Sequence, residues 1–305
     1  MTDLQERGHL LTEQVNPDSL NLDKLSSVEF VELFNREDEK AVAAVAAAKQ
    51  DLAKAIDLTA QSLKQGGRLF YVGAGTSGRL GVLDAAECPP TFCTPPELVQ
   101  GIIAGGAGAL VRSSEDLEDR AQDGEAAMAQ REITQLDVVV GITAGGTTPF
   151  VHGAINAAKS RGATTIFIAC VPSGQVSVEA DVDIRLLTGA EILAGSTRLK
   201  AGTATKLALN ILSTGVMVKL GKVYGNRMVD VAVTNKKLRD RALRILQDLT
   251  NLSREAAGAL LEHSGKWVKL AILMHETGLD KEEGNKLLLE YQGNLRKAIE
   301  TRNKV

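Results

Sequence analysis

A turn rich in glycine and hydroxyl residues gives this chain a place to bind an anion. Its sequence is Gly73-Ala74-Gly75-Thr76-Ser77-Gly78. The apolar run 69–72 before it is typical of a short strand, and helical spacing follows it. Such a turn presents backbone N–H groups at a helix N-terminus, where the peptide dipoles favour negative charge, and Thr76 and Ser77 add hydroxyl donors. We therefore predict a phosphate site. Arg79 is either a further ligand of the phosphate or an outward-facing helical arginine.

The turn does not fit the two commonest nucleotide motifs. A Walker P-loop ends in Gly-Lys-Ser/Thr, whereas this turn ends in Ser77-Gly78-Arg79. The glycines satisfy Gly-x-Gly-x-x-Gly, but the acidic residue that a Rossmann fold needs about 20 residues later would be Glu97, in a proline-rich loop. Two hydroxyl residues in the turn also suit a monophosphate better than a dinucleotide. A plain strand-to-helix connection is the less favoured reading.

Further polar residues follow other strand candidates. The strand candidate 136–142 leads into Thr143-Ala144-Gly145-Gly146-Thr147-Thr148-Pro149, a second glycine and hydroxyl turn before a helix. Segment 189–206 is rich in hydroxyls and cations, and it includes Ser196, Arg198 and Lys200. These residues are candidates to contact the same ligand.

Two groups of carboxylates can do acid–base chemistry. Glu87 precedes Cys88-Pro89-Pro90, where we expect the prolines to end the helix close to the phosphate turn. Glu115 and Glu118 lie in segment 113–119, which we expect to open another helix, and their spacing of three places them on one side of it.

The elements that must position these residues alternate along the chain. Strand candidates separated by helical segments imply right-handed crossovers and a mainly parallel sheet covered by helices on both faces, which is a three-layer α-β-α sandwich of the α/β class. Both turns then emerge at the carboxyl edge of the sheet, where such sheets bind ligands. We expect an N-terminal arm and helix at 1–50, the sandwich at 51–225, and a linker with a small helical module at 226–305. The strand candidates are 69–72, 99–104, 136–142, 164–170 and 182–187.

Composition excludes several classes of function. The 305 residues have a net charge of −3 and only 3% aromatic residues, so no basic footprint or base-stacking platform for nucleic acid is indicated. The three cysteines, Cys88, Cys93 and Cys170, form no CxxC pair, and the four histidines are scattered, which argues against a zinc site or a disulfide framework. No leader pattern and no run of 18 apolar residues are present, so we expect a cytoplasmic protein without a membrane partner.

Four motifs together give the chain a family resemblance. They are Gly73–Leu80, Asp84-Ala85-x-Glu87-Cys88-Pro89-Pro90-Thr91, Arg198–Ala204 and Met228-Val229-Asp230-Val231. With Thr12-Glu13-Gln14 and the helical tail, they resemble the bacterial N-acetylmuramic acid 6-phosphate etherases, which carry a sugar isomerase-type phosphosugar-binding domain and a ubiquitin-associated-like end. The resemblance covers nearly the whole chain, and Glu-Cys-Pro-Pro is its most specific part.

The resemblance implies removal of the D-lactyl ether from carbon 3 of the sugar phosphate, without a metal or cofactor. One carboxylate removes the proton at carbon 2 of the ring-opened sugar, and another protonates the leaving lactate oxygen before water adds. Residue by residue, the proton donor falls on Glu87 and the base on Glu118, with Glu115 as the alternative base. The resemblance also implies a homodimer, with Arg198 and Lys200 lining the site across the interface.

One loop departs from the family pattern Ala-Ser-Gly-Arg-Thr-Pro, because Gly145 and Thr147 replace its serine and arginine. Gly146, Thr147 and Thr148, with their backbone N–H groups, remain to contact the phosphosugar. An aldose–ketose isomerase and a non-catalytic sugar-phosphate sensor are the two alternative functions. The Glu-Cys-Pro-Pro motif favours the etherase over the isomerase, and both retained glutamates favour an enzyme over the sensor.

Overall fold

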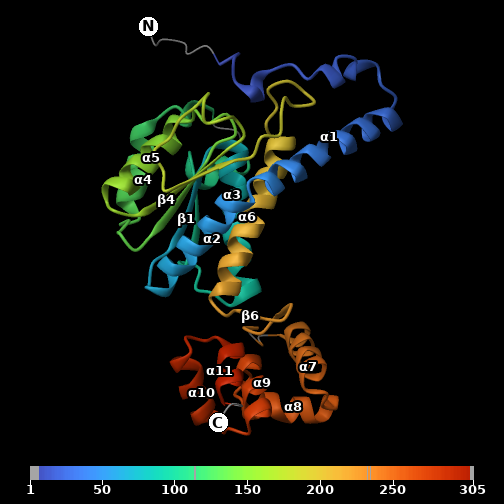
Figure 1. The fold of residues 1–305 in the computed structure, drawn as a ribbon, viewed down its shortest axis with the longest axis vertical. Helices are drawn as coiled ribbons and strands as arrows, with labels where there is room; N and C mark the ends of the chain where they lie inside the picture. Colours follow the sequence, from blue (N-terminus) through green and yellow to red (C-terminus); the bar gives the residue numbers. More distant parts are fainter. Residues whose placement is uncertain (1–6, 113–114, 232, 234, 303–305) are drawn as a thin grey trace. The chain divides into compact units, whose positions relative to one another are not determined.

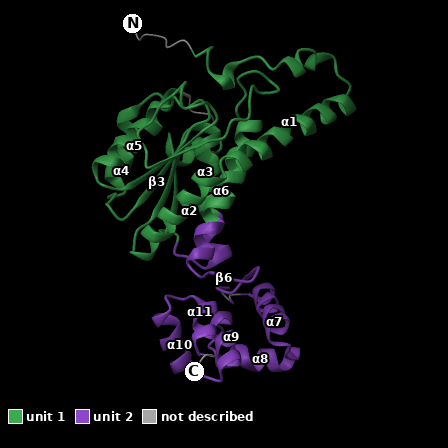
Figure 2. Cartoon of the chain, in the orientation of Figure 1, with its two compact units in different colours: residues 1–86, 96–213 green, residues 87–95, 214–305 purple. Residues whose placement is uncertain are grey.

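A computed structural model describes residues 7–112, 115–231, 233 and 235–302. The chain divides into two compact units (Figure 2). Unit 1 comprises residues 1–86 and 96–213, and unit 2 comprises residues 87–95 and 214–305. Each unit has its own apolar core. The domain boundary expected at residue 225 stays a prediction.

A five-stranded parallel sheet forms the centre of unit 1, in the order β2-β1-β3-β4-β5. Every residue of β1 and β3 is buried, as expected for central strands covered on both faces. The five expected strands are therefore present, each with one end as expected and the other end shifted by one or two residues. The strands are β1 (Leu69–Gly73), β2 (Val99–Ile103), β3 (Val138–Ile142), β4 (Thr164–Ala169) and β5 (Val182–Arg185).

Helices cover both faces of the sheet and make the three-layer sandwich that the sequence predicts (Figure 1). On one face, α4 (Ala121–Gln130) packs on α5 (Pro149–Ser160), which contacts β1, β3 and β4. On the other, α2 (Lys49–Lys64) contacts β4 and β5, and α3 (Gly75–Phe92) lies against β1 and β2. The close approach of α3 depends on small residues, because a Cβ added at Gly81 would lie 2.8 Å from the Tyr71 side chain.

The N-terminal part of unit 1 is an arm followed by a long helix. The arm runs to residue 25 and contains three short 3₁₀ turns, η1 (Leu11–Glu13), η2 (Pro17–Ser19) and η3 (Leu22–Lys24). Helix α1 (Ser27–Ala47) starts at a capping box in which Ser26 and Glu29 satisfy each other's backbone N–H groups. Its buried residues repeat every three or four positions, as the helical period requires.

Unit 2 contains a small helical bundle. After α6 (Lys200–Lys219), which begins in unit 1, the hairpin of β6 (Val223–Tyr224) and β7 (Arg227–Met228) leads into five short helices. The helices are α7 (Lys236–Thr250), α8 (Arg254–His263), α9 (Val268–Thr277), α10 (Lys281–Glu290) and α11 (Leu295–Arg302). Among the described helices of both units, none combines the length and apolar character needed to span a bilayer.

Two local expectations differ from the structure. The prolines of the Glu-Cys-Pro-Pro motif do not end α3, which continues through Pro89 and Pro90 to Phe92. The two lost N–H donors fall in the last turn, and the helix stops at Cys93, which has a left-handed φ of +52°. Segment 115–117 forms only a 3₁₀ turn, η5 (Glu115–Leu117), and α4 begins later, at Ala121. Residues 113–114 lie outside the described part.

Candidate functional site

A cavity of about 410 Å³ opens at the carboxyl ends of β1 and β3. These two strands are neighbours, but the chain continues from β1 to β2 on one side and from β3 to β4 on the other. Such a switch point is where open parallel sheets form ligand crevices. The described residues that line the cavity belong to unit 1: Arg7, Leu10, Glu13, Ala74, Gly75, Thr76, Ser77, Arg79, Leu80, Glu118, Thr143, Ala144, Gly145, Thr147, Thr148, Gly195, Thr197, Ala201, Gly202 and Thr205.

The first glycine turn brings the start of α3 to the cavity. Gly75, Thr76 and Ser77 line it, and the first helical hydrogen bond runs from the N–H of Gly78 to the carbonyl of Ala74. The N–H groups of the preceding residues therefore lie in the part of a helix that has no intrahelical acceptor. Gly78 itself is buried, and a Cβ there would lie 2.6 Å from the Ile103 side chain. Gly78 therefore allows α3 to pack closely on β2 and does not itself line the cavity.

The second glycine turn supplies the opposite part of the lining. Thr147 and Thr148 line the cavity, and the hydroxyls of Thr148 and Thr143 are hydrogen-bonded at 2.8 Å. Gly146 has a φ of +77° and lies outside the lining, while its carbonyl is 2.6 Å from Nε2 of His152. Because a carbonyl only accepts, this nitrogen is the donor of the contact. The contact fixes the shape of the turn.

Of the carboxylates predicted to be catalytic, Glu118 is among the residues of unit 1 that line the cavity. Glu118 is half-buried, and its backbone carbonyl accepts a hydrogen bond from Phe150 N–H at the start of α5, at 3.0 Å. Glu87 is exposed on α3 and belongs to unit 2. The side chain of Glu115, the alternative base, lies outside the described part of the structure.

Arg79 lines the cavity while holding a neighbouring loop. Its guanidinium donates to the carbonyl oxygens of Leu110 and Arg112, at 3.1 and 3.3 Å. Part of its guanidinium is therefore engaged by this loop, and its role as a phosphate ligand stays a prediction.

The predicted residues of segment 189–206 do not line the cavity themselves. Ser196 is half-buried and Arg198 is exposed, whereas their neighbours Gly195 and Thr197 do line it. Lys200 is only 1% exposed, and its ammonium lies 2.6 Å from a carboxylate oxygen of Glu37 on α1. Its charge is thus engaged in an internal ion pair.

The N-terminal arm adds two charged side chains that the sequence pattern did not assign to the site. Arg7 and Glu13 line the cavity. Arg7 is paired with Asp119 at 3.7 Å, and a Cβ at Gly195 would lie 3.1 Å from a Glu13 carboxylate oxygen. The only sequence signal was that Glu13 belongs to a family motif, Thr12-Glu13-Gln14.

Comparison with solved structures confirms the class of fold. The structure of a phosphoheptose isomerase from Francisella tularensis aligns with a TM-score of 0.50 and 16% identity, over 64% of this chain and all of that one. The sequence matches the SIS domain family over residues 119–214 and the glucokinase regulatory protein N-terminal SIS domain over residues 51–159. Residues 225–270 match the C-terminal lid domain of glucokinase regulatory protein. Fold and cavity thus define a protein with a sugar isomerase-type (SIS) domain.

Sequence relatives narrow this class to one family. A protein from Nostoc punctiforme described as N-acetylmuramic acid 6-phosphate etherase is 82% identical over 299 residues, which are 98% of this chain and 97% of that protein. One of the same description from Microcystis aeruginosa is 70% identical over 305 residues and the full length of both chains. The chain belongs to the N-acetylmuramic acid 6-phosphate etherase family.

Proposed function

We propose that this protein cleaves the D-lactyl ether of N-acetylmuramic acid 6-phosphate to give N-acetylglucosamine 6-phosphate and D-lactate. The observation that carries the proposal is the cavity at the switch point, where a helix N-terminus, two hydroxyl-bearing turns and the carboxylate of Glu118 share one lining. Family membership selects the substrate. We propose that the enzyme works in the cytoplasm in the recovery of cell-wall amino sugars.

The reaction is an elimination followed by a hydration. In the ring-opened sugar, the aldehyde at carbon 1 makes the proton on carbon 2 acidic. Glu118 removes this proton, a double bond forms between carbons 2 and 3, and the bond from carbon 3 to the lactate oxygen breaks. Glu87 gives the departing oxygen its proton, and water then adds at carbon 3 while a proton returns to carbon 2. The two carboxyl groups start in opposite protonation states, which different environments sustain.

The substrate carries two anionic groups, a phosphate and the lactyl carboxylate. We place the phosphate at the start of α3, where Thr76 and Ser77 supply N–H and hydroxyl donors. Thr147 and Thr148 donate from the second turn in place of the family's serine and arginine. Arg7 contributes the positive charge, because its pairing with Asp119 is long and both side chains are about half exposed or more, at 48% and 63%.

We further propose that the protein is a homodimer and that Glu87 completes the site of the second copy. One observation that supports this arrangement is that Glu87 is exposed in its own chain. Leu83, one helical turn before it, is an apolar side chain that is 48% exposed, as suits a contact between copies.

The decisive experiment is incubation with N-acetylmuramic acid 6-phosphate in 18O-labelled water, with D-lactate assayed and both products weighed by mass spectrometry. Heavy oxygen in the sugar and none in the lactate is the expected result. Absence of lactate from folded protein that still binds the phosphosugar would refute the proposed function. Glu118→Gln and Glu87→Gln should each lower the rate by about 10²–10⁴. Glu97→Gln, which alters an exposed carboxylate in a loop, is the matched control.

Mixing the two inactive variants tests where Glu87 acts. If Glu87 serves the other copy, a mixed dimer of Glu87→Gln and Glu118→Gln contains one intact site, and activity reappears after the subunits exchange. If both carboxylates act within one chain, every site in the mixture lacks one of them and no activity returns. Light scattering on each variant alone establishes that both form dimers.

A further inference from the structure

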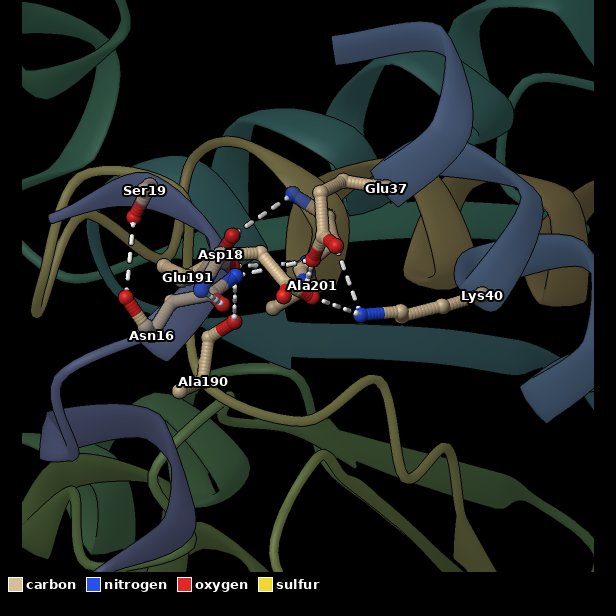
Figure 3. A network of polar contacts seen from close by, with 9 residues as sticks. Asn16, Asp18, Ser19, Glu37, Lys40, Ala190, Glu191 and Ala201 are labelled. Carbon is tan, nitrogen blue, oxygen red and sulfur yellow. Dashed lines mark hydrogen bonds and ion pairs between the residues drawn. The ribbon is translucent and has the colours of Figure 1, made fainter. Parts of the chain in front are cut away.

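A buried polar cluster connects three segments of unit 1 that are distant in the sequence (Figure 3). Its centre is the carboxylate of Glu37 on α1, a residue with no exposed surface. Helix α1 buries Leu33 and Ala41 one turn to either side of it, so the charge stands on the apolar face of the helix. A charge in that position is stable only when it is paired and hydrogen-bonded.

The three partners of Glu37 satisfy both of its oxygens. Lys200 Nζ donates to Oε2 at 2.6 Å, and Asn16 Nδ2 donates to the same oxygen at 2.8 Å. Lys40 Nζ donates to Oε1 at 2.6 Å. Lys200 is the first residue of α6 and Asn16 belongs to the N-terminal arm. One carboxylate therefore binds the arm, α1 and the start of α6 together.

Glu191 ties the loop before α6 into the same cluster. Its two oxygens accept the backbone N–H groups of Lys200 and Ala201, at 3.0 and 2.9 Å, and so cap α6. Asn16 also donates to the carbonyl of Ala190, at 3.3 Å. Burial raises the pKa of Glu191, while these backbone hydrogen bonds and the charge of Lys200 oppose the rise.

Two of the segments joined at Glu37, the N-terminal arm and the start of α6 with the loop before it, line the cavity. Glu37 itself is not among the lining residues. The arm contributes Arg7, Leu10 and Glu13, whereas the loop before α6 and its first turns contribute Gly195, Thr197, Ala201, Gly202 and Thr205. Apart from Arg79 and Glu118, the charged residues of the described lining come from the arm. The position of these charges depends on what holds the arm.

We propose that Glu37 is a positioning residue, whose carboxylate holds the N-terminal arm against the start of α6 and thereby places Arg7 and Glu13 in the phosphosugar site. The inference deepens the proposed function and rests on it for its kinetic test. Since the arm provides binding groups rather than the proposed acid and base, loosening it weakens substrate binding and leaves the chemical step unchanged.

Two variants separate this role from simple stability. Glu37→Gln removes the charge that pairs with Lys200. Asn16→Ala removes the hydrogen bond from the arm to Glu37, together with those that Asn16 makes with the carbonyl of Ala190 and the N–H of Asp18, and leaves the buried ion pair in place. Glu179→Gln, which removes an exposed partner of Lys159, is the matched control. For each we would measure kcat and KM for N-acetylmuramic acid 6-phosphate. Hydrogen exchange of residues 8–19 and of β4 would be followed by mass spectrometry.

We expect both variants to raise KM by about tenfold while kcat stays within about twofold, the signature of a lost binding contact. Exchange should quicken in residues 8–19 and not in β4. Rescue of KM in Glu37→Asp, relative to Glu37→Gln, also supports the proposal. Unchanged exchange of the arm in folded Asn16→Ala, or a loss of kcat at constant KM, overturns it. Hydrogen exchange can be measured on a protein that does not turn over substrate. If the wild type releases no lactate, the proposed function is refuted, while the exchange of residues 8–19 still tests the role of Glu37.

Discussion

Acid should remove the stabilisation that Glu37 gives to unit 1. Burial by itself would raise the pKa of this carboxyl, but hydrogen bonds from Lys200, Lys40 and Asn16 and the charge of Lys200 lower it from 4.5 to about 2. A group whose pKa is lower in the folded chain stabilises the fold at pH values above its unfolded pKa. The contribution is therefore complete at neutral pH and is lost as the pH falls from 4.5 towards 2.

The size of the effect follows from these two pKa values. A difference of roughly 2.5 units corresponds to about 3 kcal/mol in the free energy of unfolding at neutral pH. At about pH 3, the same two pKa values give a remaining contribution of about 1.4 kcal/mol to the free energy of unfolding. The amide introduced by Glu37→Gln has no proton to gain in this range. The difference in unfolding free energy between wild type and variant should therefore shrink by about 2 kcal/mol between about pH 7 and about pH 3.

Urea unfolding at both pH values measures this difference. Far-UV circular dichroism reports on the whole chain, and fluorescence of Trp267, the one tryptophan, reports on unit 2 alone. The Trp267 transition should be the same in wild type and variant. The pKa of Asp137 is also lowered, because hydrogen bonds from Arg68 and Thr134 outweigh the effect of its burial. Asp137 titrates in both proteins alike, so its contribution cancels in the difference between wild type and variant. A difference that stays constant with pH would refute the reasoning, because it would mean that Glu37 does not titrate in this range.

Two further predictions concern the second turn and the cysteines. Gly146→Ala should destabilise the protein to urea by about 1–3 kcal/mol, because φ is +77° there and a Cβ would lie 3.1 Å from two valine side chains. Gly145→Ala, whose Cβ would meet no atom closer than 3.7 Å, should change stability by less than about 0.5 kcal/mol. Under native conditions a maleimide should modify exposed Cys93 and spare Cys170, whose pKa burial raises to about 12. Peptide mass spectrometry checks this, and modification of Cys170 before unfolding would contradict it.

The parts of the fold that the sequence predicts well are those that local patterns determine. Strand β3 shows as an uninterrupted apolar run, and each glycine turn follows such a run directly. Because carboxyl ends of parallel strands share one edge, the sequence pattern places Thr76, Ser77, Thr147 and Thr148 together, and all four line the cavity. Glycine and hydroxyl residues are informative here because their role depends on backbone conformation within a few residues.

The charged residues could not be assigned in this way, because their partners are set by tertiary contacts. Lys200 stands in a segment rich in hydroxyls and cations, which is typical of an anion site, yet its partner Glu37 lies 163 positions earlier in the chain. Arg7 and Glu13 reach the cavity only because the arm folds back onto it. The prediction that Arg198 lines the site concerns an exposed side chain and stays a prediction.

One signal for Glu37 was nevertheless present. It falls on the same helical face as Leu33, Ala41 and Ala44, whereas its neighbours Asp38 and Glu39 fall outside that stripe. A single carboxylate on an apolar stripe requires a buried cation, since an unpaired charge there would be strongly destabilising. The carboxylate of Glu37 therefore implies that one lysine or arginine of the chain is used in an internal ion pair and does not bind the phosphosugar. Lys200 lies in a segment that the sequence assigns to an anion site. The carboxylate on the apolar face of α1 makes this lysine a candidate for an internal ion pair as well.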